Sequence, residues 1–427
     1  MDPLCFGQLS VWRALESLPR RQWATTNITR AVLLKDVAST EDVREALAQC
    51  CARHESLRTT YEVTDPARPR QIVHAASAPR MDVIDLPDVD PPRLQRLADA
   101  RADEPFLLDK DVGWNATLAR VRGRPAALLV TMNHIVADGW ALGRVLDEVT
   151  TLVAGDTMAQ PDQSTEPTPR ALAAAQRSTA WEARRGAAIE YWARLLRTAP
   201  LTDPPPADSD RVHCHLPLGA VSGAVTSIAK RERVFPQAVA LALTATTIAR
   251  LTRARAFLLW SMVSNRFDPR WRATVTSMNQ AIPVHVEIGS DEPFASLLSR
   301  LQLASTEAMQ HGCYDVDAVR RLALRIAGRP AEIGYLINYT ASGWPPPAAE
   351  TDLARGVAPR PTTTASRKPA TVPFYVIVSG HAELTLSVHA PRSLGCAQFV
   401  DHFRSALIAA AGSRDLRVDG SQAPFKR

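Results

Sequence analysis

A histidine and an aspartate lie four positions apart where an apolar run ends, in the segment TMNHIVADGWALGRVL, residues 131–146. His134 follows a run, 126–132, that has the pattern of a buried strand, and side chains emerge into clefts at the ends of strands. Histidine titrates near neutral pH, so it can take a proton from an attacking nucleophile and pass it on. His134 is therefore a candidate general base.

The residues after His134 admit a structural and a chemical interpretation. Asp138 stands at the expected start of a helix, where an N-cap residue is usually Ser, Thr, Asp or Asn. It could also orient the loop by pairing with an arginine. Gly139 would let the backbone approach a substrate or bend sharply, and Trp140 could cover a pocket. The spacing alone does not decide between a catalyst and a polar strand–helix junction.

The other potentially reactive side chains limit the kinds of reaction that the protein could catalyse. The sequence has no serine or cysteine in a G-x-S-x-G context, which argues against a covalent acyl-enzyme. Direct attack of a bound amine or hydroxyl on a bound acyl donor is favoured instead. His213 and His215 would share one face of a strand without an evident third ligand, and no cysteines form a C-x-x-C pair. We therefore expect no metal site.

The elements that position these residues follow from periodicity. A hairpin turning at Gly123 leads into the strand before His134, and a helix follows that ends near Gly155. One long helix is expected over 171–198, and the alternation of strands and helices restarts near 200–210. The sequence predicts an N-terminal lobe (1–170), a connecting helix and linker (171–205) and a C-terminal lobe (206–427).

The composition is that of an ordinary globular protein, with 427 residues, 46% hydrophobic, 22% charged and a net charge of +6. The basic residues are spread along the chain, so no nucleic-acid partner is expected. No stretch approaches the roughly 20 apolar residues that span a membrane, and the N-terminus does not read as a secretory signal. We expect a cytoplasmic protein with no membrane partner.

Several segments together resemble the condensation domains of nonribosomal peptide synthetases, within the chloramphenicol-acetyltransferase-like superfamily of CoA-dependent acyltransferases. Residues 133–139 (NHIVADG) resemble the family's H-H-x-x-x-D-G, and 53–61 (RHESLRTTY) resemble R-H-E-x-L-R-T-x-F. Residues 5–12 (CFGQLSVW) keep the Gln and Trp of S-x-A-Q-x-R-L-W, and 275–286 (VTSMNQAIPVHV) resemble V-G-x-F-V-N-T-L-P-L-R-V. The similarity runs in family order along nearly the whole chain.

The resemblance implies a mixed α/β (α+β) fold of two chloramphenicol-acetyltransferase-like lobes, a V-shaped pseudo-dimer with a central active-site tunnel. Acyl or peptidyl carrier proteins would reach this tunnel with their phosphopantetheine arms, and no permanently bound cofactor is implied. His134 would be a general base or a group that positions the nucleophile. Gly139 would offer a backbone N–H to the developing oxyanion.

The same resemblance assigns supporting roles. Asp138 would form a structural salt bridge with Arg266, which lies in SNRF (264–267). Trp140 and Asn338, the latter in LINYT (336–340), would face the tunnel. Residues 344–372 would fall around a crossover segment between the lobes.

The chain departs from the family pattern in places. Asn133 replaces the first histidine of the motif, a position that is structural in the family. Thr276 and Gln280 replace a glycine and an asparagine, and His285 replaces an arginine. These changes affect the expected donor or acceptor pocket rather than the class of protein.

We expect a free-standing condensation enzyme of natural-product (secondary-metabolite or antibiotic) biosynthesis. It would form an amide or ester from a carrier-bound acyl thioester and an amine or hydroxyl, free or carrier-bound. Three other classes stay open: a small acyl-CoA-dependent acyltransferase, an epimerisation relative and a non-catalytic recruitment domain. The intact His134, Asp138 and Gly139 speak against the last, whereas Asn133, Thr276 and Gln280 mildly favour it.

Overall fold

The computed structural model describes residues 2–34, 39–62, 64–155, 167–201, 210–341, 361–366, 372–380, 383–413 and 416–418. It shows a mixed α/β fold with two compact units. Unit 1 comprises Met1–Gly186, Ser264–Gln280 and Cys313–Val316, and unit 2 comprises Ala187–Val263, Ala281–Gly312 and Asp317–Arg427. The sequence-based boundaries kept everything after 206 together. In the structure the segment that carries Arg266 belongs to unit 1.

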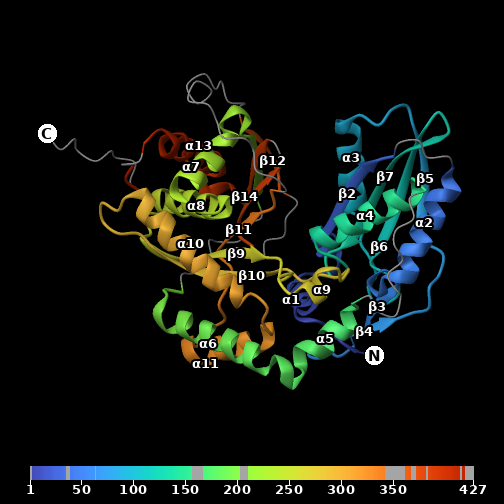
Figure 1. Cartoon of the computed structure of the whole chain (residues 1–427), viewed down its shortest axis with the longest axis horizontal. Helices are drawn as coiled ribbons and strands as arrows, with labels where there is room; N and C mark the ends of the chain where they lie inside the picture. Colours follow the sequence, from blue (N-terminus) through green and yellow to red (C-terminus); the bar gives the residue numbers. More distant parts are fainter. Residues whose placement is uncertain are drawn as a thin grey trace. The chain divides into compact units, whose positions relative to one another are not determined.

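A four-stranded sheet in the order β2-β7-β6-β5 forms the centre of unit 1 (Figure 1). Strand β7 is antiparallel to β2 and β6, and β5 runs parallel to β6. Helix α3 packs on one face, and α4 with α2 covers the other. The bounds are β2 Asn27–Leu33, β5 Met81–Leu86, β6 Trp114–Val121, β7 Arg124–Asn133, α2 Thr40–Arg53, α3 Pro91–Ala102 and α4 Gly139–Val153.

The predicted hairpin is present between β6 and β7. Arg122 and Gly123 both have positive φ, at 51° and 76°. Two consecutive residues of this kind make the turn whose twist matches antiparallel strands. The strand that leads to His134 is thereby fixed in register, with Asn133 opposite Asn27 on β2.

We predicted one helix over 171–198, and this prediction is wrong in one respect, because the helix is broken at Ser178. Helix α5 spans Pro169–Arg177 and α6 spans Glu182–Thr198, with the short turn η3 (Thr179–Trp181) between them. Ser178 is extended, and its hydroxyl donates to the Ala175 carbonyl. The Arg185 guanidinium donates to the carbonyls of Gln176 and Ser178. These side-chain bonds satisfy carbonyl groups at the break.

A second, three-stranded sheet of unit 1 (β1-β4-β3) contacts α5 and completes the described strands of this unit. The bounds are β1 Asp2–Pro3, α1 Phe6–Glu16, η1 Arg20–Thr26, η2 Glu55–Arg58, β3 Thr59–Glu62, β4 Arg70–Val73 and α9 Pro269–Arg272. The Gln and Trp of the opening motif are structural here. Gln8 accepts the Cys5 backbone N–H at 3.0 Å, and the ring of Trp12 packs edge-on against that of Trp23.

The RHE part of the 53–61 motif contacts charged side chains of α4 and α5 in unit 1. Arg53 and His54 both contact the Glu148 carboxylate of α4, at 2.9 and 2.8 Å, and Glu55 pairs with Arg170 of α5. Burial raises the pKa of Glu148, but its hydrogen bond to His54 and the nearby positive charges outweigh this, so its pKa is lowered. This motif therefore ties α2, α4 and α5 together.

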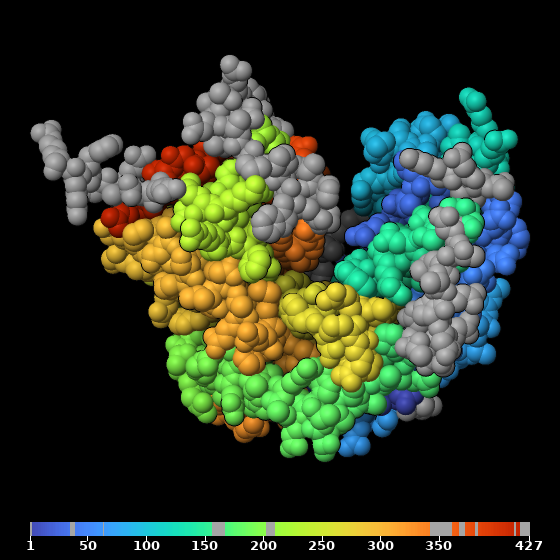
Figure 2. All heavy atoms as spheres, in the orientation of Figure 1, coloured from blue at the N-terminus to red at the C-terminus, as the bar shows by residue number. Residues whose placement is uncertain are grey.

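Unit 2 is built on a seven-stranded sheet in the order β10-β9-β11-β13-β14-β8-β12. Helices α7, α8 and α13 pack together on one side of it (Figure 1). On the surface drawn in Figure 2, α7 and α8 (yellow-green) adjoin α10 (orange). The bounds are β8 Arg211–Pro217, α7 Ser222–Glu232, α8 Pro236–Thr252, β9 Ala256–Val263, β10 Gln280–Glu287, α10 Phe294–Gln310, α11 Val316–Ala327, β11 Tyr335–Tyr339, β12 Thr362–Ala365, β13 Phe374–Gly380, β14 Leu384–Pro391 and α13 Cys396–Gly412.

Most of the expected crossover segment, 344–372, lies outside the described residues. Its described part forms β12, which pairs antiparallel with β8 of unit 2's own sheet. Strand β12 is therefore part of unit 2.

No single described helix is long and apolar enough to cross a membrane. One pair, 219–232 with 236–252, passes that test only jointly and is bent by 107°.

Candidate active site

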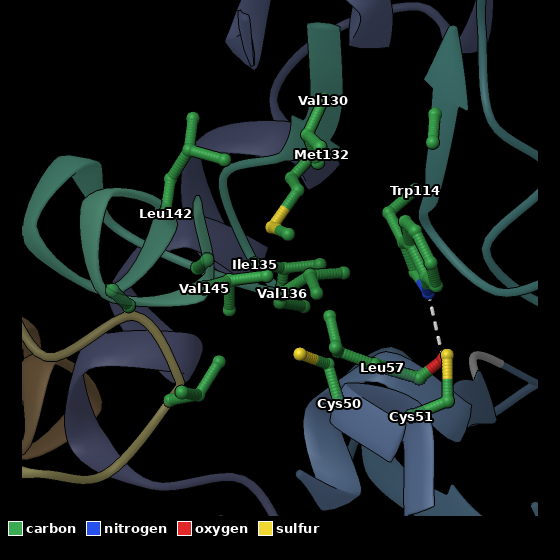
Figure 3. Packing of buried hydrophobic residues seen from close by; sticks show 14 of the residues in the cluster. Cys50, Cys51, Leu57, Trp114, Val130, Met132, Ile135, Val136, Leu142 and Val145 are labelled. Atoms are coloured by element: carbon green, nitrogen blue, oxygen red, sulfur yellow. Dashed lines mark hydrogen bonds between the residues drawn. The ribbon is translucent and has the colours of Figure 1, made fainter. Parts of the chain in front are cut away.

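His134 lies in the turn that follows β7. Ile135, Val136 and Ala137 are fully buried, whereas His134 itself is half-buried. Figure 3 shows Ile135 and Val136 lying between Met132 of β7 and Cys50 of α2. The apolar side chains that follow His134 thus anchor the turn in the core of unit 1 and fix where the imidazole emerges.

Asn133, which replaces the first histidine of the motif, is a buried structural residue. Its Nδ2 donates to Thr26 Oγ1 at 3.0 Å and to Asn27 Oδ1 at 3.1 Å, and its Oδ1 accepts the Ile135 N–H. The Asn27 amide in turn donates to the carbonyls of Ala102 and Glu104. The Asn133 amide thus forms hydrogen bonds with buried polar groups on both sides of the turn, and an asparagine can fill the structural role of this position.

Asp138 combines the two structural roles that the sequence left open. Its Oδ1 accepts the Ala141 N–H at 2.9 Å, which caps α4. Both carboxylate oxygens accept from Arg266 Nη2 at 3.0 Å, and Oδ2 also accepts the Met278 N–H. Both side chains are 4% exposed. Losing either partner would leave a buried charge uncompensated.

Arg266 also holds the segment that follows it. Its guanidinium donates to the carbonyl oxygens of Thr274 at 2.8 Å and Thr276 at 2.9 Å. On its other side the guanidinium lies 4.4 Å from the centre of the Trp140 ring, a cation–π contact. Trp140 is 44% exposed. Its indole therefore lies over the ion pair and presents its remaining surface to solvent.

Ser277, at the end of that segment, contacts the histidine. Its Oγ lies 3.4 Å from His134 Nδ1 and donates to Asn279 Oδ1 at 3.1 Å. With its hydroxyl proton directed to Asn279, the Ser277 oxygen can accept from Nδ1–H of His134. In that tautomer Nε2 carries the lone pair, the form that a general base needs.

The position of Ser277 is set by a close approach of α1. A Cβ on Gly7 would lie 2.3 Å from the Ser277 carbonyl oxygen, and the neighbouring Cys5 thiol donates to that oxygen at 3.5 Å. Glycine is the residue that permits such proximity. The opening motif of the chain therefore fixes the segment that contacts His134.

Gly139 is the first residue of α4, where backbone N–H groups have no partner within the helix. A Cβ built on Gly139 meets no atom within 4 Å. The fold of the described residues therefore does not require a glycine here. An N–H at the positive end of a 15-residue helix is suited to a developing oxyanion.

Six of the predicted residues belong to unit 1 and lie on one turn or on the segment bonded to it. They are Asn133, His134, Asp138, Gly139, Trp140 and Arg266. Asn338, the seventh, belongs to β11 of unit 2. It is half-buried, and its Nδ2 donates to the Tyr375 hydroxyl on β13 at 3.1 Å. Its expected role toward substrate stays a prediction.

His213 and His215 do share one face of β8, with ring centres 5.9 Å apart. His389 of β14 stacks on His213 at 4.2 Å with planes 6° apart. Among the described residues no group of three or more His, Cys, Asp or Glu side chains is placed to hold a metal ion.

Two residues of this unit were missed by sequence reasoning. Glu148 falls within the apolar face of α4 between Val145 and Leu152, and an acid at such a position signals a buried ion pair. Ser277 occupies a variable position of its motif, and only its distance from His134 reveals it.

The sequence profile of the Condensation domain family matches residues 15–331. The chain belongs to the condensation domain family. It is 27% identical over 324 residues to phosphinothricin tripeptide synthetase PhsC of Streptomyces viridochromogenes, covering 72% of this chain and 29% of that protein. The chain spans less than a third of the length of such curated relatives.

Solved structures confirm the condensation-domain fold. The condensation domain that mediates chain release from the enacyloxin polyketide synthase matches with a TM-score of 0.77 at 20% identity, covering 100% of this chain and 84% of that one. A variant of the starter condensation domain of rhizomide synthetase RzmA, bound to C8-CoA and Leu-SNAC, matches at 0.75 and 17% identity, covering 98% and 96%. The chain thus has the condensation-domain fold, and its curated relatives include nonribosomal peptide synthetases.

Proposed function

We propose that this condensation domain catalyses acyl transfer from a phosphopantetheinyl thioester to an amine or hydroxyl, forming an amide or an ester. The observation that carries the proposal is the 3.4 Å contact between Ser277 Oγ and His134 Nδ1, which supports the tautomer with Nδ1 protonated and Nε2 basic. A non-catalytic recruitment domain would have no need of this tautomer.

In the proposed reaction, Nε2 of His134 takes the proton of the nucleophile as it attacks the thioester carbonyl carbon. The C–S bond breaks after the tetrahedral intermediate, and the thiolate leaves with the proton returned by the imidazolium. The Gly139 N–H lies at the helix N-terminus, where it would stabilise the oxyanion. Asp138 and Arg266 position the turn and do not touch the reacting atoms.

The donor is proposed to arrive on an acyl or peptidyl carrier protein. Support comes from the family, whose members in nonribosomal peptide synthesis use such arms. The rhizomide synthetase domain was solved with C8-CoA and Leu-SNAC, and coenzyme A carries the same phosphopantetheine group. An acyl-CoA is therefore the second donor to be considered. Asn338 and Trp140 are proposed to contact the substrates.

Mass spectrometry of an acyl-loaded carrier protein tests this function. The domain is added with an amine, with an alcohol, or with neither, and an acyl-CoA replaces the carrier in a parallel series. Acyl loss with equal formation of the amide or ester is expected. Binding of the carrier without acyl loss under any condition would contradict catalysis and indicate recruitment.

A further inference from the structure

The face of the unit 2 sheet opposite α7, α8 and α13 carries a row of imidazoles. Register places Tyr375, His389, His213 and Thr364 side by side on β13, β14, β8 and β12. His215 follows two residues later on β8, opposite Ser387. Neighbouring strands thus bring three histidines together from two distant parts of the sequence.

Specific contacts hold the three rings. His213 and His389 are stacked at 4.2 Å with planes 6° apart, and His215 meets His213 edge-on. Ser366 Oγ lies 2.9 Å from His389 Nδ1, and Ser387 Oγ lies 3.2 Å from His215 Nδ1. The rings are therefore fixed by their neighbours and keep a defined spacing.

The described strand positions on this face carry basic but no acidic side chains. At the positions of β8, β12, β13 and β14 that share it, the described residues include no Asp or Glu, while Arg211 lies two residues before His213. His389 is buried and the other two histidines are half-buried. Imidazoles donate hydrogen bonds, and when charged they donate from both nitrogens. Charge-assisted bonds of this kind favour an anion.

We propose that His213, His215 and His389 form a binding site for an anionic group, a carboxylate or a phosphate, carried by a small molecule. A bound anion would favour the charged form of these rings, and the charged rings would donate hydrogen bonds to it. The three histidines all belong to unit 2.

Imidazole signals of the ¹³C-histidine-labelled full chain test the site, with benzoate as the carboxylate probe and inorganic phosphate as the second. We expect saturable shifts at these three of the ten histidines. A response to benzoate assigns an organic acid, and a response to phosphate assigns a phosphoryl group. The double variant His213→Gln/His389→Gln should weaken binding by about tenfold or more, as expected for lost charge-assisted hydrogen bonds.

His402→Gln, on α13, is the matched control and should leave the affinity unchanged. If the double variant does not fold, His215→Gln alone should still weaken binding several-fold. No saturable shift at the three histidines with either probe, or equal affinity in the folded variants, would overturn the proposal. Because this is an equilibrium measurement, its failure and the failure of acyl transfer are distinguishable.

Discussion

The turn between β7 and α4 has two sides that differ in what their side chains contact. On the inner side Asn133 and Asp138 are buried and bonded to groups of the same unit. On the outer side His134 is half-buried, Trp140 is exposed and Gly139 has open space. The structural side chains and the proposed chemical ones are thus separated within eight residues, so substitutions on the two sides should affect different measurements.

The largest effect on stability is expected from Arg266→Met. The variant leaves the Asp138 carboxylate buried without its partner, which should lower the free energy of unfolding by about 3–5 kcal/mol. Urea denaturation measures this. The matched control is Arg392→Met, which removes an ion pair whose side chains are both 63% exposed and should leave the unfolding midpoint nearly unchanged. Equal effects of the two variants would contradict the structural role of Asp138 and Arg266.

A smaller loss, about 1.5–3 kcal/mol at neutral pH, is expected for Glu148→Gln, which weakens charged hydrogen bonds. The pKa of Glu148 is lowered in the folded protein. Its contribution is therefore present above the ordinary glutamate pKa of about 4.3 and is lost as the pH falls through the lowered value. Unfolding curves of variant and parent should converge in acid. Glu41→Gln, at a side chain 76% exposed, should match the parent throughout.

The substitution Gly139→Ala tests the outer side of the turn between β7 and α4. Alanine meets no described atom here and is the better helix former, so the unfolding midpoint should not fall. The added methyl would crowd a substrate oxygen at the helix N-terminus, and kcat/KM should drop by about tenfold, which corresponds to about 1.4 kcal/mol. Gly186→Ala in α6 also meets open space and is the control for both measurements. Unchanged turnover in Gly139→Ala would contradict the close approach of a substrate oxygen to this helix N-terminus.

The smallest effect is expected for Ser277→Ala. Ser277 contacts His134 and not the substrate, so kcat should fall about threefold to tenfold while KM stays the same, as for a lost hydrogen bond of about 1 kcal/mol. Ser277→Thr keeps the hydroxyl and should recover most of the rate. A change in KM instead of kcat, or no recovery with threonine, would show that Ser277 does not position His134.

The local parts of this site could be predicted from sequence. The hairpin at Gly123, the strand to His134 and the cap at Asp138 depend on neighbouring residues, and the structure shows all three. The Asp138–Arg266 pair joins residues 128 positions apart. Periodicity carries no information at that distance, and the pair was expected only through the family resemblance.

Two further features of the structure were not predicted, because they also depend on contacts that periodicity does not register. The break at Ser178 depends on bonds from Arg185 back to the chain, which helix propensity does not register. The contact of Ser277 with His134 depends on the packing of Gly7 against the Ser277 backbone. Neither contact follows from helix or strand periodicity, so the sequence alone predicted the class of protein and named His134 as a candidate, but it did not predict these contacts.

The most direct test of the central claim is turnover and unfolding of His134→Ala measured side by side. With an acyl-loaded carrier protein and an amine acceptor, product formation should fall by about 100-fold or more, the usual contribution of a general base. The urea midpoint should stay close to that of the parent, because His134 is on the outer side of the turn. Undiminished turnover in the folded variant would contradict the claim that His134 carries the chemistry.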